Sequence, residues 1–192
     1  MLKPNREAMA FLATRRSRPG KSLVGPAPSA DALRPILAAS LRVPDHGKLE
    51  PWRFIVLEVD ALSRLGGVAQ ARGEALGLEP EQIAKGRAQF DDGNLCVAVI
   101  EVQKPSEKIP ALEMTYSAGA VCLALLNAAL ASGWGANWLS GWPSHDRGFM
   151  QEGLGLAAHE RIAGLIYLGT ERTAPPERPR PRLEEITTWV SA

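Results

Sequence analysis

Two arginines and a serine near the N-terminus, Arg15, Arg16 and Ser17, are the residues of this chain best suited to hold an anion. Guanidinium groups offer paired charged donors, and the serine hydroxyl adds another, so together they can clamp a phosphate group. Taken alone, a basic run ending in Arg18 at a helix end is more often a solvated surface. The chemistry of the triplet nevertheless favours a bound anion.

A second cluster lies in the loop from Pro44 to Trp52, which carries His46 and leads into an apolar run. A histidine in such a loop is either a turn residue or a ligand contact. His46 and Glu50 are four residues apart, but no third metal ligand follows at a usable spacing, so no metal site is expected. His46 is therefore a candidate for contact with a bound small molecule.

The two cysteines are expected to be reduced packing residues. Cys96 lies in an apolar strand-like run and Cys122 in an apolar helix-like run, without the close spacing of a redox or zinc pair. No Ser-His-Asp or Cys-His constellation can be drawn from the sequence either. The N-terminal residues lack the apolar core of a secretory signal, so a cytoplasmic location is expected.

The composition favours one globular domain over residues 1–192. Hydrophobic residues make up 45% of the chain and charged residues 22%, with a formal net charge of +1. This balance gives no electrostatic reason to expect nucleic acid or an anionic membrane surface as a partner.

An alternation of helical and strand patterns must position the candidate residues. It predicts helices over 5–16, 30–41 and 146–153, and strands over 54–59, 95–100 and 162–169. Residues 61–92 have weak helical spacing, broken at Gly66-Gly67 and at Glu79-Pro80, which is typical of a mobile or substrate-covering region.

The segment 113–132 reads as one helix that is apolar on nearly all sides. Its uninterrupted apolar stretch, 118–126, is far shorter than a bilayer requires, so a membrane span is rejected. A small chain has little interior for such a helix, and a second subunit could cover it. We therefore predict a homodimer.

The C-terminal segment is expected to reach away from the body of the protein. Residues 173–182 contain four prolines and three arginines, a composition typical of extended chain. The β-branched and aromatic residues of 183–190 favour a terminal edge strand or a docking segment.

Four landmarks in order resemble the FMN-dependent nitroreductase family, in particular its short bacterial subgroup. They are the Arg-Arg-Ser triplet, the Pro-Asp-His loop entering Pro-Trp, the glycine-rich segment with Trp138, and a Tyr-Leu-Gly strand before an Arg/Pro tail. The resemblance covers essentially the whole chain. It implies an α+β fold with a mostly antiparallel central sheet flanked by helices, and a homodimer with FMN at the subunit interface.

The resemblance also assigns roles to individual residues, none of them catalytic because the flavin carries the chemistry. Arg15, Arg16 and Ser17 would hold the phosphate and ribityl chain, and Arg42 and His46 would contact FMN, in part from the partner subunit. The remaining assignments are Trp138, Leu139 and Ser140 along the isoalloxazine ring, with Arg180 and Arg182 of the tail reaching the phosphate.

This chain departs from the family pattern at three places. Glu50 stands where many relatives carry an amide, Leu139 replaces an arginine common in the subgroup, and the asparagine found before Pro-Trp in longer members is absent. The contact of Glu50 with the flavin ring is therefore in question.

The activity implied is transfer of hydride from NADH or NADPH through FMN to nitroaromatic or quinone-like acceptors, with ping-pong kinetics. No Gly-x-Gly-x-x-Gly fingerprint is present, so the nicotinamide would bind only transiently. The alternatives are an FMN enzyme that dehydrogenates or dehalogenates a specific metabolite, and a flavin-binding or flavin-free partner protein without turnover.

Overall fold

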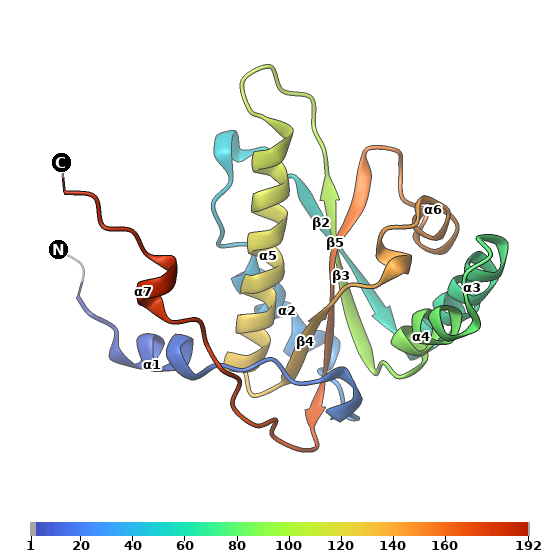
Figure 1. Ribbon diagram of the computed structural model, residues 1–192, viewed down its shortest axis with the longest axis horizontal. Helices are drawn as coiled ribbons and strands as arrows, with labels where there is room; N and C mark the ends of the chain where they lie inside the picture. Colours follow the sequence, from blue (N-terminus) through green and yellow to red (C-terminus); the bar gives the residue numbers. More distant parts are fainter. Residues whose placement is uncertain (1–2, 192) are drawn as a thin grey trace.

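An antiparallel sheet organises the chain, of which the computed structural model describes residues 3–191. The strands are β1 (Leu23–Val24), β2 (Trp52–Glu58), β3 (Leu95–Val102), β4 (Gly135–Leu139) and β5 (Glu160–Glu171). Their order is β1-β5-β3-β2, and β4 also pairs with β5; every pairing is antiparallel. With helices on both sides of the sheet, this arrangement confirms the predicted α+β fold (Figure 1).

The strand β3 is apolar because both faces of the sheet are covered. Its residues from Leu95 to Glu101 are all buried. Successive side chains point to opposite faces, so Cys96 and Ala98 enter one core cluster while Val97 enters the other. The continuous apolar run of β3 is therefore explained by packed layers on both faces of the sheet.

One face of the sheet is covered by α2 (Ala30–Ser40) and α5 (Ala111–Ala131), close to the ranges predicted (Figure 1). By length and composition α5 could cross a membrane, but its inner side packs into the core cluster that includes Val97. In the isolated chain the outer side of α5 is exposed, and its cover by a second subunit stays a prediction. Leu112, Tyr116 and Leu123 form an exposed apolar stripe along α5.

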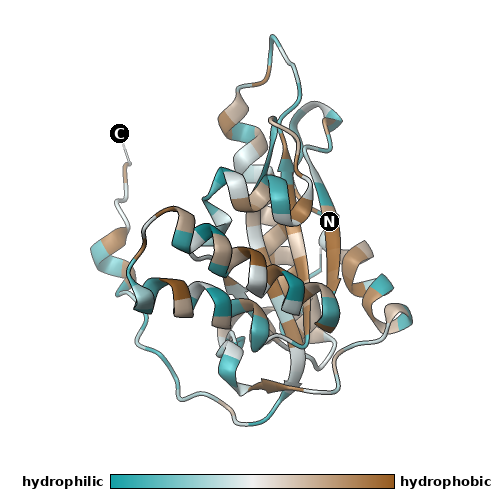
Figure 2. Cartoon of the chain, turned by 90° about the vertical axis from the view of Figure 1, so that its right-hand side faces the viewer, coloured by the Kyte–Doolittle hydropathy of each residue, from teal (hydrophilic) through white to brown (hydrophobic). Residues whose placement is uncertain are grey.

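The opposite face is covered by α3 (Val59–Ala75), α4 (Pro80–Asp91) and α6 (Arg147–Leu154), which lie in front of the apolar strands in Figure 2. Strand β2 ends at Glu58, one residue before the end predicted for it, because Val59 already begins α3. The break predicted at Gly66-Gly67 is also wrong. A side chain at the buried Gly66 would collide with the Asp91 carboxylate of α4, so the glycine permits close helix packing.

The break predicted at Glu79-Pro80 is present. Glu79 caps α4 through a reciprocal capping box with Gln82, and Pro80 occupies the first turn, where its missing N–H costs nothing.

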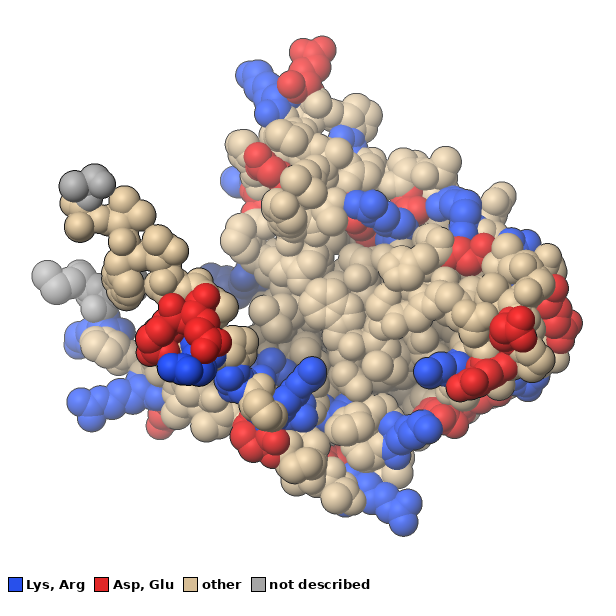
Figure 3. Space-filling model, viewed as in Figure 1, with Lys and Arg blue, Asp and Glu red and all other residues tan. Residues whose placement is uncertain are grey.

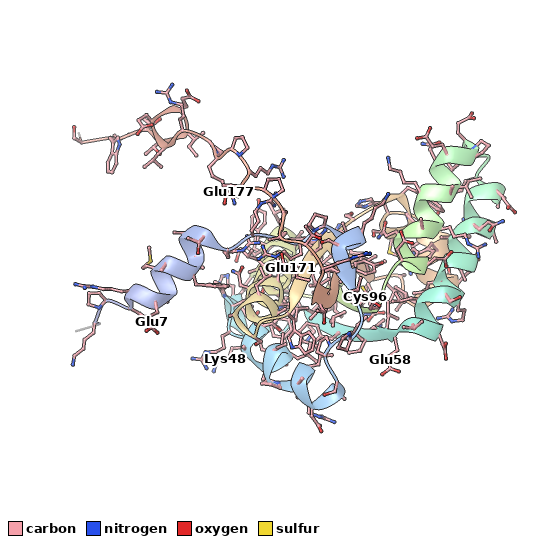
Figure 4. The ribbon with its side chains drawn as sticks, turned by 90° about the horizontal axis from the view of Figure 1, so that it is seen from below. Glu7, Lys48, Glu58, Cys96, Glu171 and Glu177 are labelled. Atoms are coloured by element: carbon pink, nitrogen blue, oxygen red, sulfur yellow. The ribbon has the colours of Figure 1, made fainter. Side chains whose placement is uncertain are left out.

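Two arms leave the body on the same side (Figures 1 and 4). One is α1 (Arg6–Thr14), on which Asn5 caps the first turn by accepting from Ala8 N. The other is the C-terminal tail with α7 (Leu183–Ile186). Of the two alternatives predicted for 183–190, the edge strand is wrong, because α7 forms instead. The docking segment stays a prediction, and Ile186 and Trp189 are 70% and 89% exposed.

Candidate functional site

Four arginines surround one cavity at the base of the two arms. The cavity has a volume of about 420 Å³ and is lined by Arg15, Arg16, Ser17, Pro19, Asn137, Trp138, Arg178 and Arg180. These residues come from three places far apart in sequence: the segment after α1, strand β4, and the proline-rich tail. The basic side chains gather where the tail leaves the body in Figure 3.

The arginines of this cavity have unused donors. Arg15 Nε and Arg16 Nε are buried and lack a hydrogen-bond partner within the described structure. Burial, followed by the charges of Arg180, Arg16 and Arg18, lowers the pKa of Arg15. Since buried donors and crowded like charges are both costly, an anion with several oxygens would complete the site.

Arg18 has a different role from its neighbours, because it is paired inside the chain. Its Nε lies 2.7 Å from Glu171 Oε1, its Nη1 donates to Arg16 O at 2.7 Å, and its backbone N–H donates to Ala136 O at 2.8 Å. These contacts fix the segment after α1 against β4. Within the triplet, Arg15 Nη2 donates to Ser17 Oγ at 3.0 Å, which orients the serine toward the arginines.

One acidic side chain, Glu177, lies beside the tail arginines (Figure 4). Its carboxylate accepts from Arg178 N at 2.8 Å and pairs with Arg180 Nη2 at 3.1 Å. The backbone bond from Arg178, and then the charges of Arg180 and Arg16, lower the pKa of Glu177. Glu177 thus balances part of the basic charge, but it leaves the two buried Nε atoms unpartnered.

The strand β4 offers backbone groups next to the arginine cavity. Because Ala136 O accepts from Arg18 on the edge away from β5, the N–H and C=O of Trp138, two residues on, face the same edge. Gly164 on β5 makes room for the Trp138 indole, since a side chain there would collide with its Nε1. Backbone groups on this edge could hydrogen-bond a planar ligand.

A second cavity, of about 580 Å³, adjoins this edge on the side of α4. Leu139 and Tyr167 line it from the sheet, and Lys85 and Gln89 line it from α4. Tyr167 Oη and Gln89 Nε2 are buried, and neither has a partner with hydrogen-bond geometry within the described structure. Burial raises the pKa of the Tyr167 phenol, with a further contribution from Cys96, so the phenol is a neutral donor.

His46 lies at the other end of α5. It opens a short 3₁₀ turn, His46–Lys48, and its Nδ1 is 2.6 Å from Glu113 Oε2 in the first turn of α5. The segment after α1, which carries Arg15, passes the last turn of α5 at the opposite end of the helix (Figure 1). At 1.5 Å per residue the helix is about 30 Å long, so His46 cannot share one small ligand with Arg15 of its own chain.

The predicted site residues thus fall into separate groups. Arg15, Arg16, Ser17, Trp138 and Arg180 line one cavity, with Leu139 in the adjoining one and Ser140 next along the chain. Arg42 and His46 are exposed away from them, as is Glu50. Arg182 is outside the cavity and pairs with Glu185 at 3.2 Å, whereas Arg178, which sequence reasoning missed, lines it.

Both cysteines are free and buried, in line with the packing role expected for them. Burial raises the pKa of Cys122 to about 12 and that of Cys96 further, so neither thiol ionises readily.

Residues 12–170 match the family model described as the nitroreductase family. The chain belongs to the nitroreductase family. A relative from Escherichia coli K12, YdjA, named as a candidate NAD(P)H nitroreductase, is 33% identical over 164 residues, which cover 85% of this chain and 88% of YdjA. A relative with the same kind of name from Haemophilus influenzae is 33% identical over 166 residues, covering 85% of this chain and 88% of the relative.

Solved structures show the nitroreductase fold over the whole length. A nitroreductase-like protein from Bacillus cereus superposes with a TM-score of 0.81 at 21% identity and covers 100% of both chains. A candidate nitroreductase from Desulfovibrio desulfuricans, solved in complex with FMN, gives a TM-score of 0.73 at 21% identity and covers 97% of this chain and 96% of its own. At this level of identity, these structures bear on the fold alone.

Proposed function

We propose that this nitroreductase-family protein is an FMN-dependent NAD(P)H oxidoreductase that acts as a homodimer. The observation that carries the proposal is the pair of buried, unpartnered Nε atoms of Arg15 and Arg16 in a cavity of four arginines. A phosphate monoester supplies the charge and the several acceptor oxygens that this donor set lacks. The names of the relatives, and the FMN complex of a structural neighbour, agree with this ligand.

The protein's residues would bind and orient the cofactor. Arg15, Arg16, Arg178 and Arg180 would hold the phosphate, with Ser17 on the adjoining ribityl chain. The outer edge of β4 from Trp138 to Ser140 would offer backbone hydrogen bonds to the ring, with the Leu139 side chain beside it. Bound FMN supplies the redox chemistry, accepting a hydride and passing the electrons on. No side chain is required to form a covalent bond.

The proposed dimer brings the two separated groups of residues together. In one chain Arg42 and His46 are remote from the arginine cavity, so they would complete the site of the partner subunit. The surface over α5 and β4 carries few charged groups in Figure 3, and Leu112, Tyr116 and Leu123 are exposed there. A surface of this composition supports an interface between two copies.

The nicotinamide and the acceptor would use the cavity under α4 in turn. Its lining combines the apolar Leu139 with Lys85 and the amide of Gln89, which suits a flat, polar-edged ring. Sequential occupation of one cavity gives ping-pong kinetics, with nitroaromatics or quinones as acceptors. We propose that residues 1–192 act as one domain in the cytoplasm.

The decisive experiment is anaerobic reduction of the purified protein loaded with FMN. NADH and NADPH are added separately, and bleaching of the flavin absorbance is followed before a nitroaromatic or a quinone is introduced. The proposal predicts bleaching by at least one nucleotide and recovery of absorbance with the acceptor. Flavin that binds but is bleached by neither nucleotide would favour another flavin reaction, and failure to take up FMN would favour a partner protein without turnover.

The shared site can be tested by complementation. Arg16→Ala should impair the arginine cavity, and His46→Ala the loop expected to face it across the interface. A mixed dimer of the two variants contains one site with both defects and one with neither. Each mixed dimer should therefore recover one of its two FMN sites, which is about a quarter of wild-type binding after random exchange of equal amounts. No recovery after verified subunit exchange would exclude the shared site.

A further inference from the structure

Glu113 fixes the ring of His46. A carboxylate can only accept, so Nδ1, 2.6 Å from Glu113 Oε2, carries the proton and donates it. The other ring nitrogen, Nε2, makes no hydrogen bond or ion pair within residues 3–191, and the His46 side chain is 63% exposed. The pair thus sets the orientation of the ring and leaves one nitrogen free for a ligand.

The loop around His46 does not depend on Glu113 for its shape. The Asp45 carboxylate accepts from the backbone N–H groups of Leu49 and Glu50 at 3.1 and 2.9 Å. Ser117 Oγ of α5 donates to Pro44 O at 2.8 Å and accepts from Trp52 Nε1 at 3.1 Å. The backbone is therefore anchored at both ends of the loop, and Glu113 acts on the imidazole ring.

The pair is also poorly placed to serve folding. The Glu113 side chain is 43% exposed, and ion pairs this open to water add little to stability. It lies in the turn of α5 that carries the exposed Leu112 and Tyr116, at the end of the apolar stripe. In the dimer proposed above, this position faces the second copy.

We propose that Glu113 is a positioning residue that holds His46 so that Nε2 faces an anionic oxygen of FMN bound in the partner subunit. With Nδ1 already donating to Glu113, the ring donates from Nε2 to that oxygen as an imidazolium, with a proton on each nitrogen. The inference rests on the proposed function, and it assigns to Glu113 a role in the site that the sequence did not indicate. Two parts of FMN offer such an oxygen: the phosphate, and the ring when its reduced form carries a negative charge.

A double-mutant cycle on the FMN-loaded dimer tests this coupling. Glu113→Ala and His46→Ala should each weaken FMN binding about tenfold, the size expected for loss of a hydrogen bond to a charged group. The double variant should be no weaker than His46→Ala, because Glu113 acts through the ring. Glu113→Gln keeps the acceptor without the charge and should recover part of the loss. Glu107→Gln, an exposed carboxylate in the loop before α5, is the matched control.

Two further measurements identify the oxygen. If His46 contacts the phosphate, the variants weaken binding of FMN but not of riboflavin, which lacks the phosphate. If it contacts the reduced ring, they lower the midpoint potential of bound FMN by about 30 mV for each tenfold selective loss of the reduced form.

Either pattern supports the proposal. It is overturned if FMN affinity and midpoint potential are both unchanged in the Glu113 variants, or if the effect of Glu113→Ala is undiminished when His46 is already alanine. If Glu113→Ala does not fold, Glu113→Gln alone must show part of the effect. A wild-type protein that binds FMN and is reduced by NAD(P)H keeps the proposed function intact whatever the cycle gives.

Discussion

Arg18 and Glu171 form an ion pair with a 2.7 Å contact between Nε and Oε1, next to two arginines that have no such pair among the described residues. One run of four residues therefore serves two purposes. Arg18 fastens the segment to the sheet, and Arg15 and Arg16 keep their donors for a ligand. This division separates the effects expected from substituting each arginine.

Arg16→Ala should weaken FMN binding about 10- to 100-fold, because it removes charged donors from the cavity without breaking a structural contact. Arg18→Ala should instead lower the free energy of unfolding, by about 1 kcal/mol, through loss of its ion pair and side-chain hydrogen bond. Arg34→Ala, on an exposed part of α2, is the control for lost charge. Fluorescence titration with FMN, together with urea unfolding, distinguishes the two effects. Equal FMN affinity in Arg16→Ala and wild type would remove the arginine cavity from the proposed site.

Gly164→Ala should displace the Trp138 indole, which lines the arginine cavity. A methyl group there would collide with the Trp138 indole and lie 2.9 Å from the Cys122 sulfur, so the indole has to move. Overpacking of this kind costs about 1–3 kcal/mol of stability. FMN binding should weaken as well, because β4 supplies the proposed ring contacts; Gly67→Ala, where a methyl group meets open space, serves as the control. Retention of both wild-type melting temperature and FMN affinity in Gly164→Ala would contradict this account.

A charge on the exposed stripe of α5 should separate the subunits. Tyr116 is 66% exposed, and Tyr116→Glu would bury a carboxylate in the proposed interface. Light scattering should then show a monomer with an unchanged circular dichroism spectrum and weak FMN binding. Leu76→Glu adds the same charge at the end of α3 and should leave the dimer intact. A dimeric Tyr116→Glu variant would mean that another surface forms the interface.

The acid stability of the fold should depend on Glu160. Hydrogen bonds from Arg53, at 2.6 and 3.0 Å, are the main cause that lowers the pKa of Glu160 to about 2, against about 4.3 in an unfolded chain. Because the folded value is the lower one, the stabilisation is complete above about pH 4.5 and is lost as the pH falls toward 2.

Glu160→Gln should therefore cost about 1–3 kcal/mol at pH 7 and flatten the loss of stability between pH 4.5 and 2. Urea unfolding across this range measures both effects. Glu7→Gln on the exposed α1 is the control and should show the wild-type dependence of stability on pH. The same wild-type dependence in Glu160→Gln would mean that the pair with Arg53 does not form in solution.

Local patterns in the sequence predicted the elements that carry strong periodicity. The apolar runs of β3 and β5 and the long helix α5 lie close to their predicted positions, since burial in the core dictates those residues directly. The helix break at Gly66-Gly67 was predicted wrongly because glycine also permits close packing, and a sequence window does not contain the neighbouring Asp91. Strand β4 has only five residues, one of them glycine and one asparagine, and has no periodic signal strong enough to reveal it.

The site was predictable where adjacent residues share one function, as in Arg15, Arg16 and Ser17. It was less predictable where distant segments meet. Arg178 lines the cavity while Arg182 does not, because the course of the proline-rich tail over β4 decides which arginines turn inward. The pairing of His46 with Glu113 joins residues 67 positions apart, and nothing in the local pattern around Glu113 marks it.

The length of α5 has a further consequence for how the protein would behave at different concentrations. With the segment that carries Arg15 at one end of the helix and His46 at the other, the proposed shared site would link FMN binding and subunit association in one equilibrium. Each FMN bound across the interface would tighten the dimer, and each dimer formed would retain FMN more strongly. Dilution without FMN would then favour separate chains, and added FMN would favour the dimer.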